Sequence, residues 1–301
     1  MTSNQSHKAV VFGSVSIDKI VNKHGSFPEI LGGSAAYAIL ANKKNSCELV
    51  GVVGDDFHQK HFDLLSDHSL STNSLTRLPG NTFCWGGQYK DDFSSRETLY
   101  VDPGVSESYI PKLSSLVKNS PFLLLGNTAP HLQIELLNQM QSDPFVLLDT
   151  FKLYIDIANK DLKDLIKRVD LFCINFNEAR AISGMDGSDL VAMSKKILDL
   201  GPKSLIIKDG ENGSHYFDSR NNYSIKAFPI KEVIDTTGAG DAYIGGILMG
   251  KMSGMNIFDS MKIGAVTASF CIEGVGVKGL LKMSDLEFEE RLAWMNANHT
   301  S

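Results

Sequence analysis

Short, uninterrupted apolar runs recur along most of this 301-residue chain and constrain its fold more than any other feature. We expect buried strands at residues 9–12, 48–53, 122–125, 145–148, 171–174 and 205–207. Continuous rather than alternating apolar residues are typical of a parallel sheet that is covered on both faces. Amphipathic stretches separate several of these runs, at residues 33–42, 131–141 and 190–200. The pattern therefore predicts an α/β fold with a mostly parallel central sheet.

Two segments interrupt this alternation. Residues 17–31 hold a strand-like run followed by a turn that contains glycine and proline, and residues 82–101 alternate apolar and polar residues around a polar tip at 90–96. Such alternation is typical of antiparallel strands with one solvated face. We predict that these segments form a small β-structure, a lid, apart from the main sheet. Without repeats or a clear linker, residues 1–301 are expected to form a single domain that carries this lid.

The negative net charge of the chain limits the classes of molecule that it is expected to bind. A formal net charge of −6 and a pI near 5.8 argue against general binding to nucleic acid or to an anionic membrane. The chain shows neither a charged-then-apolar signal peptide nor an apolar run of membrane-spanning length. Its four cysteines lack the spacing of a metal site, so we expect reduced, mostly buried thiols. The expected location is the cytoplasm, and the expected partner is a small molecule.

The most informative motif is the string at residues 235–248, DTTGAGDAYIGGIL. A strand-like pair, residues 233–234, leads into Gly238, Ala239 and Gly240, and Asp241 opens an apolar helix. Small residues let backbone N–H groups converge on an anion at a helix N-terminus. A carboxylate beside that anion hole could accept a proton from a hydroxyl, which points to phosphoryl transfer to an alcohol. The alternative is an ordinary tight strand–helix turn with a helix cap.

Further motifs occur in a fixed order along the chain. They are GGSAAYA at residues 32–38, GVVGDDF at 51–57, NFNE at 175–178 and KDGENG at 208–213. Together with the 235–248 string, they resemble the signature motifs of the ribokinase-like, or PfkB, carbohydrate kinases. The resemblance implies a three-layer α/β/α fold and ATP-dependent phosphorylation of a hydroxymethyl or similar alcohol on a sugar. A nucleoside is the alternative substrate, and a non-catalytic sugar- or nucleotide-binding regulator is the alternative function.

The resemblance also implies roles for particular residues. Asp241 would be the catalytic base, and Gly238, Ala239 and Gly240 would bind the transferring phosphoryl oxygens. We expect Asp241 to stay ionised at neutral pH because it lies at a helix N-terminus. Asn175 and Glu178 would lie in the Mg²⁺–phosphate region, with Glu178 bound to Mg²⁺ through water. From spacing alone, the same pair could be a helix cap and a surface residue.

On the acceptor side, the resemblance and the ligand-binding edge of the sheet point to one set of residues. The predicted substrate-binding residues are Asp18, Gly32, Gly33, Tyr37, Asn127 and Arg96. Tyr37 stands where sugar-binding members carry asparagine, and Gly126-Asn127 stands where ribokinases carry glutamate. These departures argue against ribose or fructose and leave another sugar or a nucleoside, whose base could stack on an aromatic ring. Lid residues such as Arg96 would either close over the substrate or serve as ordinary packing or dimer contacts.

On the nucleotide side, the resemblance implies ATP and Mg²⁺ as cofactors. The predicted nucleotide-binding residues, besides Asn175 and Glu178, are Lys208, Gly210, Gly213 and Gly276. Lys208 could equally be a solvated charge at a strand end. Asp235 and Thr237 are candidates for a K⁺ site, and the lid is a candidate surface for a homodimer.

Overall fold

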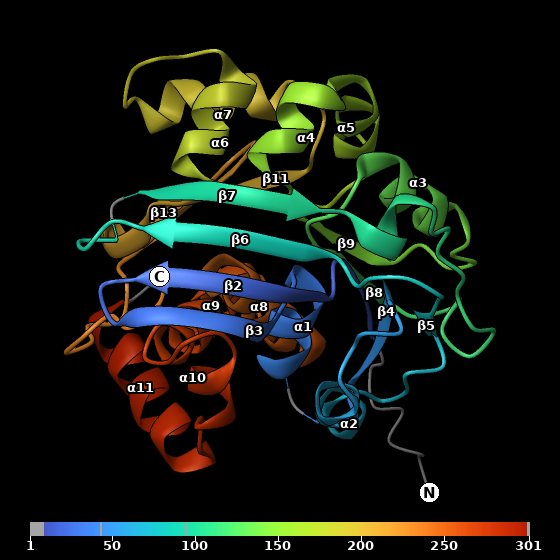
Figure 1. Cartoon of the computed structure of the whole chain (residues 1–301). Coiled ribbons are helices and arrows are strands. Elements are labelled where there is room, and N and C mark those ends of the chain that lie inside the picture. The colour runs from blue at the N-terminus through green and yellow to red at the C-terminus, as the bar shows by residue number, and fades with distance from the viewer. Residues whose placement is uncertain (1–8, 43, 94, 300–301) are drawn as a thin grey trace, which may run out of the picture.

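The computed structural model describes residues 9–42, 44–93 and 95–299 (Figure 1). Within these residues one large sheet runs through the molecule, with the strand order β13-β12-β11-β10-β9-β8-β1-β4-β5. Neighbouring strands are parallel except for the two pairs that β12 forms, with β11 and β13. The strands of this sheet are β1 (Ala9–Phe12), β4 (Cys47–Val53), β5 (Leu75–Arg77), β8 (Phe122–Leu125), β9 (Phe145–Leu148), β10 (Leu171–Asn175), β11 (Ser204–Lys208), β12 (Ser214–Asp218) and β13 (Asn222–Ile225).

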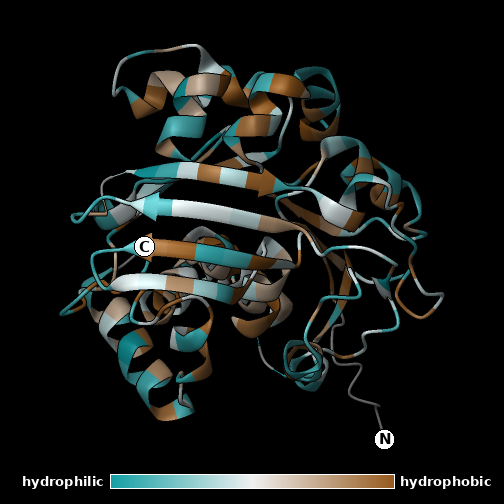
Figure 2. Ribbon diagram, viewed as in Figure 1, coloured by the Kyte–Doolittle hydropathy of each residue, from teal (hydrophilic) through white to brown (hydrophobic). Residues whose placement is uncertain are grey.

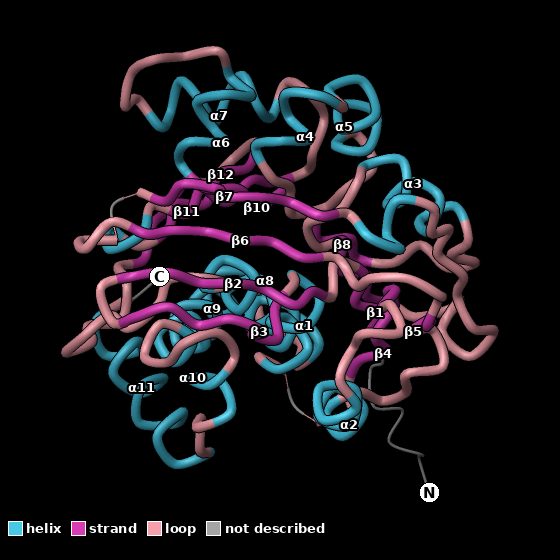
Figure 3. Tube along the Cα trace, in the orientation of Figure 1, coloured by secondary structure: helices cyan, strands magenta, loops and turns pink. Residues whose placement is uncertain are grey.

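Helices cover both faces of this sheet, as expected for strands without a polar face. Successive residues of β1 enter different cores: Val11 packs with α1, α8 and α9, whereas Val10 packs with α3, α5 and α7. The predicted three-layer α/β/α fold is thereby confirmed (Figure 3). The helices are α1 (Ser34–Leu40), α2 (Gln59–His68), α3 (Pro130–Asn138), α4 (Lys152–Ile157), α5 (Asn159–Ile166), α6 (Phe176–Ser183), α7 (Leu190–Leu198), α8 (Ala239–Met252), α9 (Ile257–Cys271), α10 (Lys278–Leu281) and α11 (Asp285–Asn298).

The two interrupting segments form one separate sheet, which crosses the front of the molecule in Figure 1. Its strand order is β3-β2-β6-β7, from β2 (Ser16–Asn22), β3 (Gly25–Gly32), β6 (Cys84–Tyr89) and β7 (Arg96–Asp102). The hairpins β2–β3 and β6–β7 are antiparallel as predicted, but the central pair β2–β6 is parallel. The chain leaves this sheet after β3 and builds α1, β4, α2 and β5 before it returns, so β6 arrives by a crossover. We call this four-stranded sheet the lid.

The strand expected at residues 233–234 is wrong. Both residues lie outside the strands of the structure. The N–H groups of Ile234 and Asp235 instead donate to the carbonyl oxygen of Ile272, just past the end of α9. A short apolar pair therefore lies against a helix terminus and not in a sheet.

The environment of the cysteines and the hydropathy of the helices match the sequence expectations. Cys47, Cys173 and Cys271 are buried, Cys84 is half-buried, and all are free thiols. Among the residues that the structure describes, no helix combines the length and the apolar character needed to span a bilayer.

Candidate functional site

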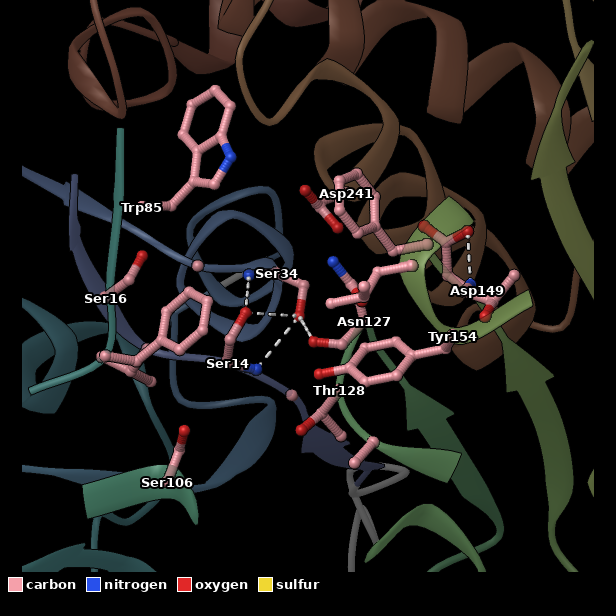
Figure 4. Close-up of a pocket in the computed structure, with 18 of the residues that line it drawn as sticks. Ser14, Ser16, Ser34, Trp85, Ser106, Asn127, Thr128, Asp149, Tyr154 and Asp241 are labelled. Atoms are coloured by element: carbon pink, nitrogen blue, oxygen red, sulfur yellow. Dashed lines mark hydrogen bonds between the residues drawn. The ribbon is translucent and has the colours of Figure 1, made fainter. Parts of the chain in front are cut away.

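A cavity of about 600 Å³ lies between the lid and the carboxyl ends of the parallel strands (Figure 4). Residues at or just beyond the ends of β1, β8, β9, β10 and β11 line it, which is the edge where parallel sheets bind ligands. From the lid come Asp18, Trp85 and Arg96, and from the start of α8 come Gly238, Gly240 and Asp241. Residues from the amino-terminal motifs and from the 235–248 motif therefore line the same cavity.

The start of α8 contains the segment for which the sequence predicts an anion hole. Gly238 is the N-cap with φ 76°, and no side chain caps the helix. A Cβ at Gly238 would lie against the ring of Tyr37, so this position needs glycine both for its backbone angle and for space. The N–H of Ala239 already donates to the carbonyl of Thr236 at 3.3 Å. The first turn of a helix has N–H groups without an intrahelical acceptor, and such groups can bind an anion. Gly238 and Gly240 line the cavity.

Asp241 lies in this first turn and lines the cavity. Burial, and next the nearby Asp149 carboxyl, raise its pKa to about 7, although Lys208 and Arg96 oppose the shift. The expectation that the helix terminus keeps Asp241 fully ionised at neutral pH is therefore wrong. Loss of hydration outweighs the favourable dipole at this position.

Lys208 pairs with a carboxylate that the sequence interpretation missed. Its Nζ lies 3.2 and 3.3 Å from the two carboxylate oxygens of Asp149, and only 14% and 6% of the two side chains are exposed. A Cβ at Gly240 would lie 3.0 Å from the same Nζ, so the ammonium lies against the anion-hole backbone. Lys208 is thus a buried cation, not a solvated charge. Asp149 directly follows the predicted strand 145–148. Its place at the carboxyl end of a parallel strand could have identified it as a candidate site residue.

Asn175 and Glu178 form a reciprocal helix cap. The Asn175 side chain accepts the N–H of Glu178 at 3.0 Å, and the Glu178 carboxylate accepts the N–H of Asn175 at 2.9 Å. Glu178 is only 4% exposed, so it is not a surface helix residue. Burial and the Asp149 carboxyl raise the pKa of Glu178 to about 7. Asn175 and Glu178 therefore cap the N-terminus of α6. Both residues also line the cavity.

Asp18 lies within the lid strand β2 and is 4% exposed. Burial raises its pKa to about 7, and its Oδ1 has no hydrogen-bond partner among the described residues. A Cβ at Gly32 would collide with this carboxyl group, whereas one at Gly33 would collide with the carbonyl of Ser14. Gly33 also has φ 95° and lines the cavity, but Gly32 does not. The two glycines thus bring β3 close to Asp18 and to the chain after β1.

Tyr37 and Asn127 close the inner side of the cavity. Tyr37 is 1% exposed, and its hydroxyl has no hydrogen-bond partner within the described part of the chain. The Asn127 backbone carbonyl accepts hydrogen bonds from the Ser14 N–H and the Ser34 hydroxyl, drawn in part in Figure 4. Its side-chain Oδ1 is buried and likewise unpartnered in the described residues. The backbone of Asn127 is therefore fixed, whereas its side-chain oxygen is left without a donor.

The remaining predicted residues occupy different places. Gly210, with φ 56°, lines the cavity, whereas Gly213 and Gly276 do not. Gly213 turns the chain from β11 into β12, and Gly276 donates its N–H to Asp235 at 2.8 Å. The other oxygen of Asp235 accepts both the N–H and the hydroxyl of Thr237. Asp235 is therefore held by protein donors just behind the anion-hole segment.

The lid adds a cation and several aromatic rings. The Arg96 guanidinium lies over Trp85 at 5.2 Å and over Phe151 at 5.3 Å. Phe83 and Tyr154 also line the cavity. Phe151 and Tyr154 were missed, because single aromatic residues after a strand show no pattern in the sequence.

The sequence of the chain is similar to those of known kinases. The family model for the pfkB family of carbohydrate kinases matches residues 6–282. A cytidine kinase of Thermococcus kodakarensis is 29% identical and is aligned over 85% of this chain and 92% of its own.

Two solved structures share the fold. One is a nucleoside kinase of Burkholderia thailandensis in complex with inosine, with a TM-score of 0.79, 18% identity, and coverage of 97% of this chain and 100% of that one. The other is a putative ribokinase II of E. coli in complex with ATP and Mg²⁺, with a TM-score of 0.79, 16% identity, and coverage of 95% and 99%. The chain therefore belongs to the PfkB family of carbohydrate kinases and is a phosphotransferase that acts on an alcohol group.

Proposed function

We propose that this kinase transfers the γ-phosphoryl group of ATP to a hydroxymethyl or similar hydroxyl of a sugar or sugar derivative, with Asp241 as the base. One observation carries the proposal: Asp241 lines the cavity at the uncapped start of α8. The base and the anion-binding N–H groups thus belong to one helical turn. An acceptor hydroxyl beside that turn would have a proton acceptor and a phosphoryl site within reach.

The proposed step moves one proton and one phosphoryl group. The acceptor hydroxyl gives its proton to the Asp241 carboxylate as its oxygen bonds to phosphorus, and the bond to the ADP oxygen breaks. Residues Gly238–Gly240 and the Lys208 ammonium would stabilise the charge on the phosphoryl oxygens. The pKa of Asp241, about 7, suits a base that works near neutral pH.

The residues on the donor side fit Mg²⁺. Mg²⁺ uses one or two carboxylates, several waters and substrate phosphates and needs no all-protein cage. In the described part of the chain, no group of three or more acidic, histidine or cysteine residues could hold a metal. The buried carboxylate of Glu178, beside Asp149, supplies what such a partly hydrated ion needs. Mg²⁺ bound there would neutralise phosphate charge.

The other nucleotide-side assignments are also proposals. Lys208 and Gly210 would face the phosphates, and Gly213 and Gly276 would shape the turns around the nucleotide. A K⁺ ion near Asp235 and Thr237 and a homodimer through the lid stay predictions. β7 becomes more hydrophobic along its length (Figure 2), and Leu99 and Val101 are exposed there.

On the acceptor side, Asp18, Asn127 and Arg96 would contact the substrate, with Gly33 and Tyr37 shaping its surroundings and Gly32 supporting Asp18. A nucleoside is the second candidate acceptor. Aromatic rings around the cavity favour it, because a flat base can stack on them. These rings belong to Phe83, Trp85, Phe151 and Tyr154. The similarity to a cytidine kinase supports the same choice.

The test combines a substrate panel with one substitution. Wild-type protein is incubated with MgATP and a set of sugars and nucleosides, and ADP release is measured. Asp241→Asn should lower the turnover of the best acceptor by at least about 100-fold and leave ATP affinity within a few-fold. Near-normal turnover in this variant contradicts the role of Asp241. Saturable binding without any product in the wild-type protein favours a non-catalytic regulator.

A further inference from the structure

The cavity has two chemically different parts. The inner part is polar and buried: Asp18, Tyr37 and Thr150 line it and are at most 4% exposed. Each of the three has a side-chain oxygen without a hydrogen-bond partner among the described residues. The outer part is apolar and open, since Leu153 is 41% and Ile157 is 69% exposed although both line the same cavity. A matching ligand would therefore carry hydroxyl groups at one end and an apolar group at the other.

The helix α4 supplies the apolar part. Leu153, Tyr154 and Ile157 line the cavity, and their spacing of three and four residues places them on one face of the helix. The charged residues Lys152 and Asp156 pair with each other at 2.7 Å and do not line the cavity. The helix therefore presents an uncharged face to a ligand.

The lid lies close to the start of this helix. Phe151, the N-cap of α4, and Trp85 of the lid lie 5.3 and 5.2 Å from the same group, the Arg96 guanidinium. Val101, near the end of the lid strand β7, also lines the cavity and is 40% exposed. The Tyr154 side chain points into the cavity (Figure 4). A flat group bound between the lid and α4 would thus contact apolar side chains from both.

The charged residues of the lining favour an uncharged acceptor. Lys208 is already paired with Asp149. Arg96 begins β7, whereas Glu107 lines the cavity beyond the end of that strand and would repel an anion. The described residues of α4 that line the cavity are all uncharged. A phosphate or carboxylate at the α4 end of an acceptor would lack a partner there, which is costly for a charge that leaves water.

We propose that the acceptor is a nucleoside whose sugar binds in the polar part and whose base lies between α4 and the lid, with Tyr154 as a specificity-determining residue. This inference rests on the proposed function, because the sugar hydroxyl is the group phosphorylated at Asp241. It narrows that function, since a free sugar would fill only the polar part. A base is flat, uncharged and aromatic, so it can stack on the tyrosine ring and cover Leu153 and Ile157.

The first experiment compares acceptors that share one sugar. Turnover with MgATP is measured for ribose, for a ribofuranoside with a butyl group in place of the base, and for cytidine, uridine, adenosine and inosine, with fructose 6-phosphate as an anionic sugar. The best nucleoside should exceed ribose in kcat/KM by about 100-fold and the butyl compound by about tenfold. A free sugar, a sugar phosphate or the butyl compound that equals the best nucleoside overturns the inference.

The second experiment tests the wall that α4 forms. Tyr154→Ala should raise the KM of the best nucleoside about tenfold and leave kcat/KM for ribose within about twofold, because only the base loses a stacking partner. Tyr154→Phe keeps the ring and should keep the wild-type KM. Leu153→Ala should raise the KM several-fold. Its matched control is Leu286→Ala, which removes a leucine that is 73% exposed on α11 and does not line the cavity.

Two outcomes of this second experiment overturn the inference. An unchanged nucleoside KM in Tyr154→Ala would mean that the base does not lie against α4. An equal loss for ribose and for the nucleoside would mean that Tyr154 supports the fold of the site and does not select the base.

A binding measurement separates this inference from the proposed base. The affinities of the best nucleoside and of ribose are measured by calorimetry on Asp241→Asn with Mg²⁺ and a non-hydrolysable ATP analogue, so no turnover is needed. The nucleoside should bind about 100-fold more tightly than ribose, and the additional change Tyr154→Ala should remove about tenfold of that difference. Equal affinities overturn the inference whatever the turnover. Normal turnover in Asp241→Asn refutes the base and leaves the order of affinities as the test of the nucleoside.

Discussion

At the scale of single residues, three carboxyl groups of the site have a raised pKa. Burial is the first cause at Asp18, Glu178 and Asp241, and the pKa of each is raised to about 7. In the unfolded chain these groups lose their protons near pH 4. Between about pH 4 and pH 7 the folded protein therefore binds more protons than the unfolded chain. The contribution of these three groups to stability then falls as pH rises through this window, because the unfolded state binds fewer protons.

Activity and stability should consequently move in opposite directions. Between pH 5 and pH 7, kcat/KM should rise about tenfold per pH unit, as Asp241 becomes ionised. Over the same range, the free energy of unfolding should fall, as measured by urea titration at each pH. Asp241→Asn is the control, because it removes one carboxyl group with a raised pKa. The slope of its free energy of unfolding against pH should be smaller than the wild-type slope by about 1 kcal/mol per pH unit. Equal slopes in the two proteins would contradict the burial argument for Asp241.

At the scale of elements, the turn between β3 and α1 is a tight junction beside the cavity. Gly33 has φ 95°, and a Cβ there would strike the backbone of Ser14. Gly184, the C-cap of α6, has a similar requirement for φ, 64°, but nothing lies within 4 Å of its Cβ position. A substitution at Gly184 therefore measures the free-energy cost of the backbone angle alone. The same substitution at Gly33 adds the cost of the close contact with Ser14.

We therefore expect unequal effects of the same substitution. Gly184→Ala should lower the free energy of unfolding by about 1 kcal/mol, the usual cost of a left-handed backbone angle. Gly33→Ala should cost at least about twice as much, since the Ser14 backbone must also move. It should also weaken acceptor binding, because Ser14 and Gly33 both line the cavity. Equal losses of stability, measured by urea unfolding, would show that the contact with Ser14 is easily relieved.

The elements also show why sequence patterns succeed and fail. Six parallel strands of the main sheet were predictable because their residues are apolar on both faces, as in β1 and β8. The edge strands β5 and β13 were not, because they are short and contain exposed polar residues, Arg77 and Asn222. The strand β12, next to β13, was also missed. In the site, Asp241 was marked by its glycine-rich neighbours. Asp149 was not, because its role depends on an ion pair across the sheet with a residue from another strand.

At the scale of the whole molecule, the lid and the main sheet line one cavity. Binding should therefore stabilise the entire fold, since an unfolded chain has no such space. At 100 times the dissociation constant, a bound nucleotide adds about 2.7 kcal/mol to the free energy of unfolding. We expect a non-hydrolysable ATP analogue with Mg²⁺ to raise Tm by several degrees in both the wild-type protein and Asp241→Asn. A shift in the wild-type protein alone would mean that Asp241 is needed for nucleotide binding.

The contact between Tyr37 and Gly238 has a consequence for synthesis of the chain. These two residues are far apart in sequence, yet the tyrosine ring lies where a Cβ at Gly238 would be. The Asn42 side chain, which donates to the Gly245 carbonyl at 2.9 Å, connects the same two helices, α1 and α8. On the ribosome, the first half of the chain must therefore wait with this surface uncovered until the last quarter emerges. A chain that ends prematurely before α8 would lack Asp241 and leave the buried residues of α1 that pack on α8 open to water.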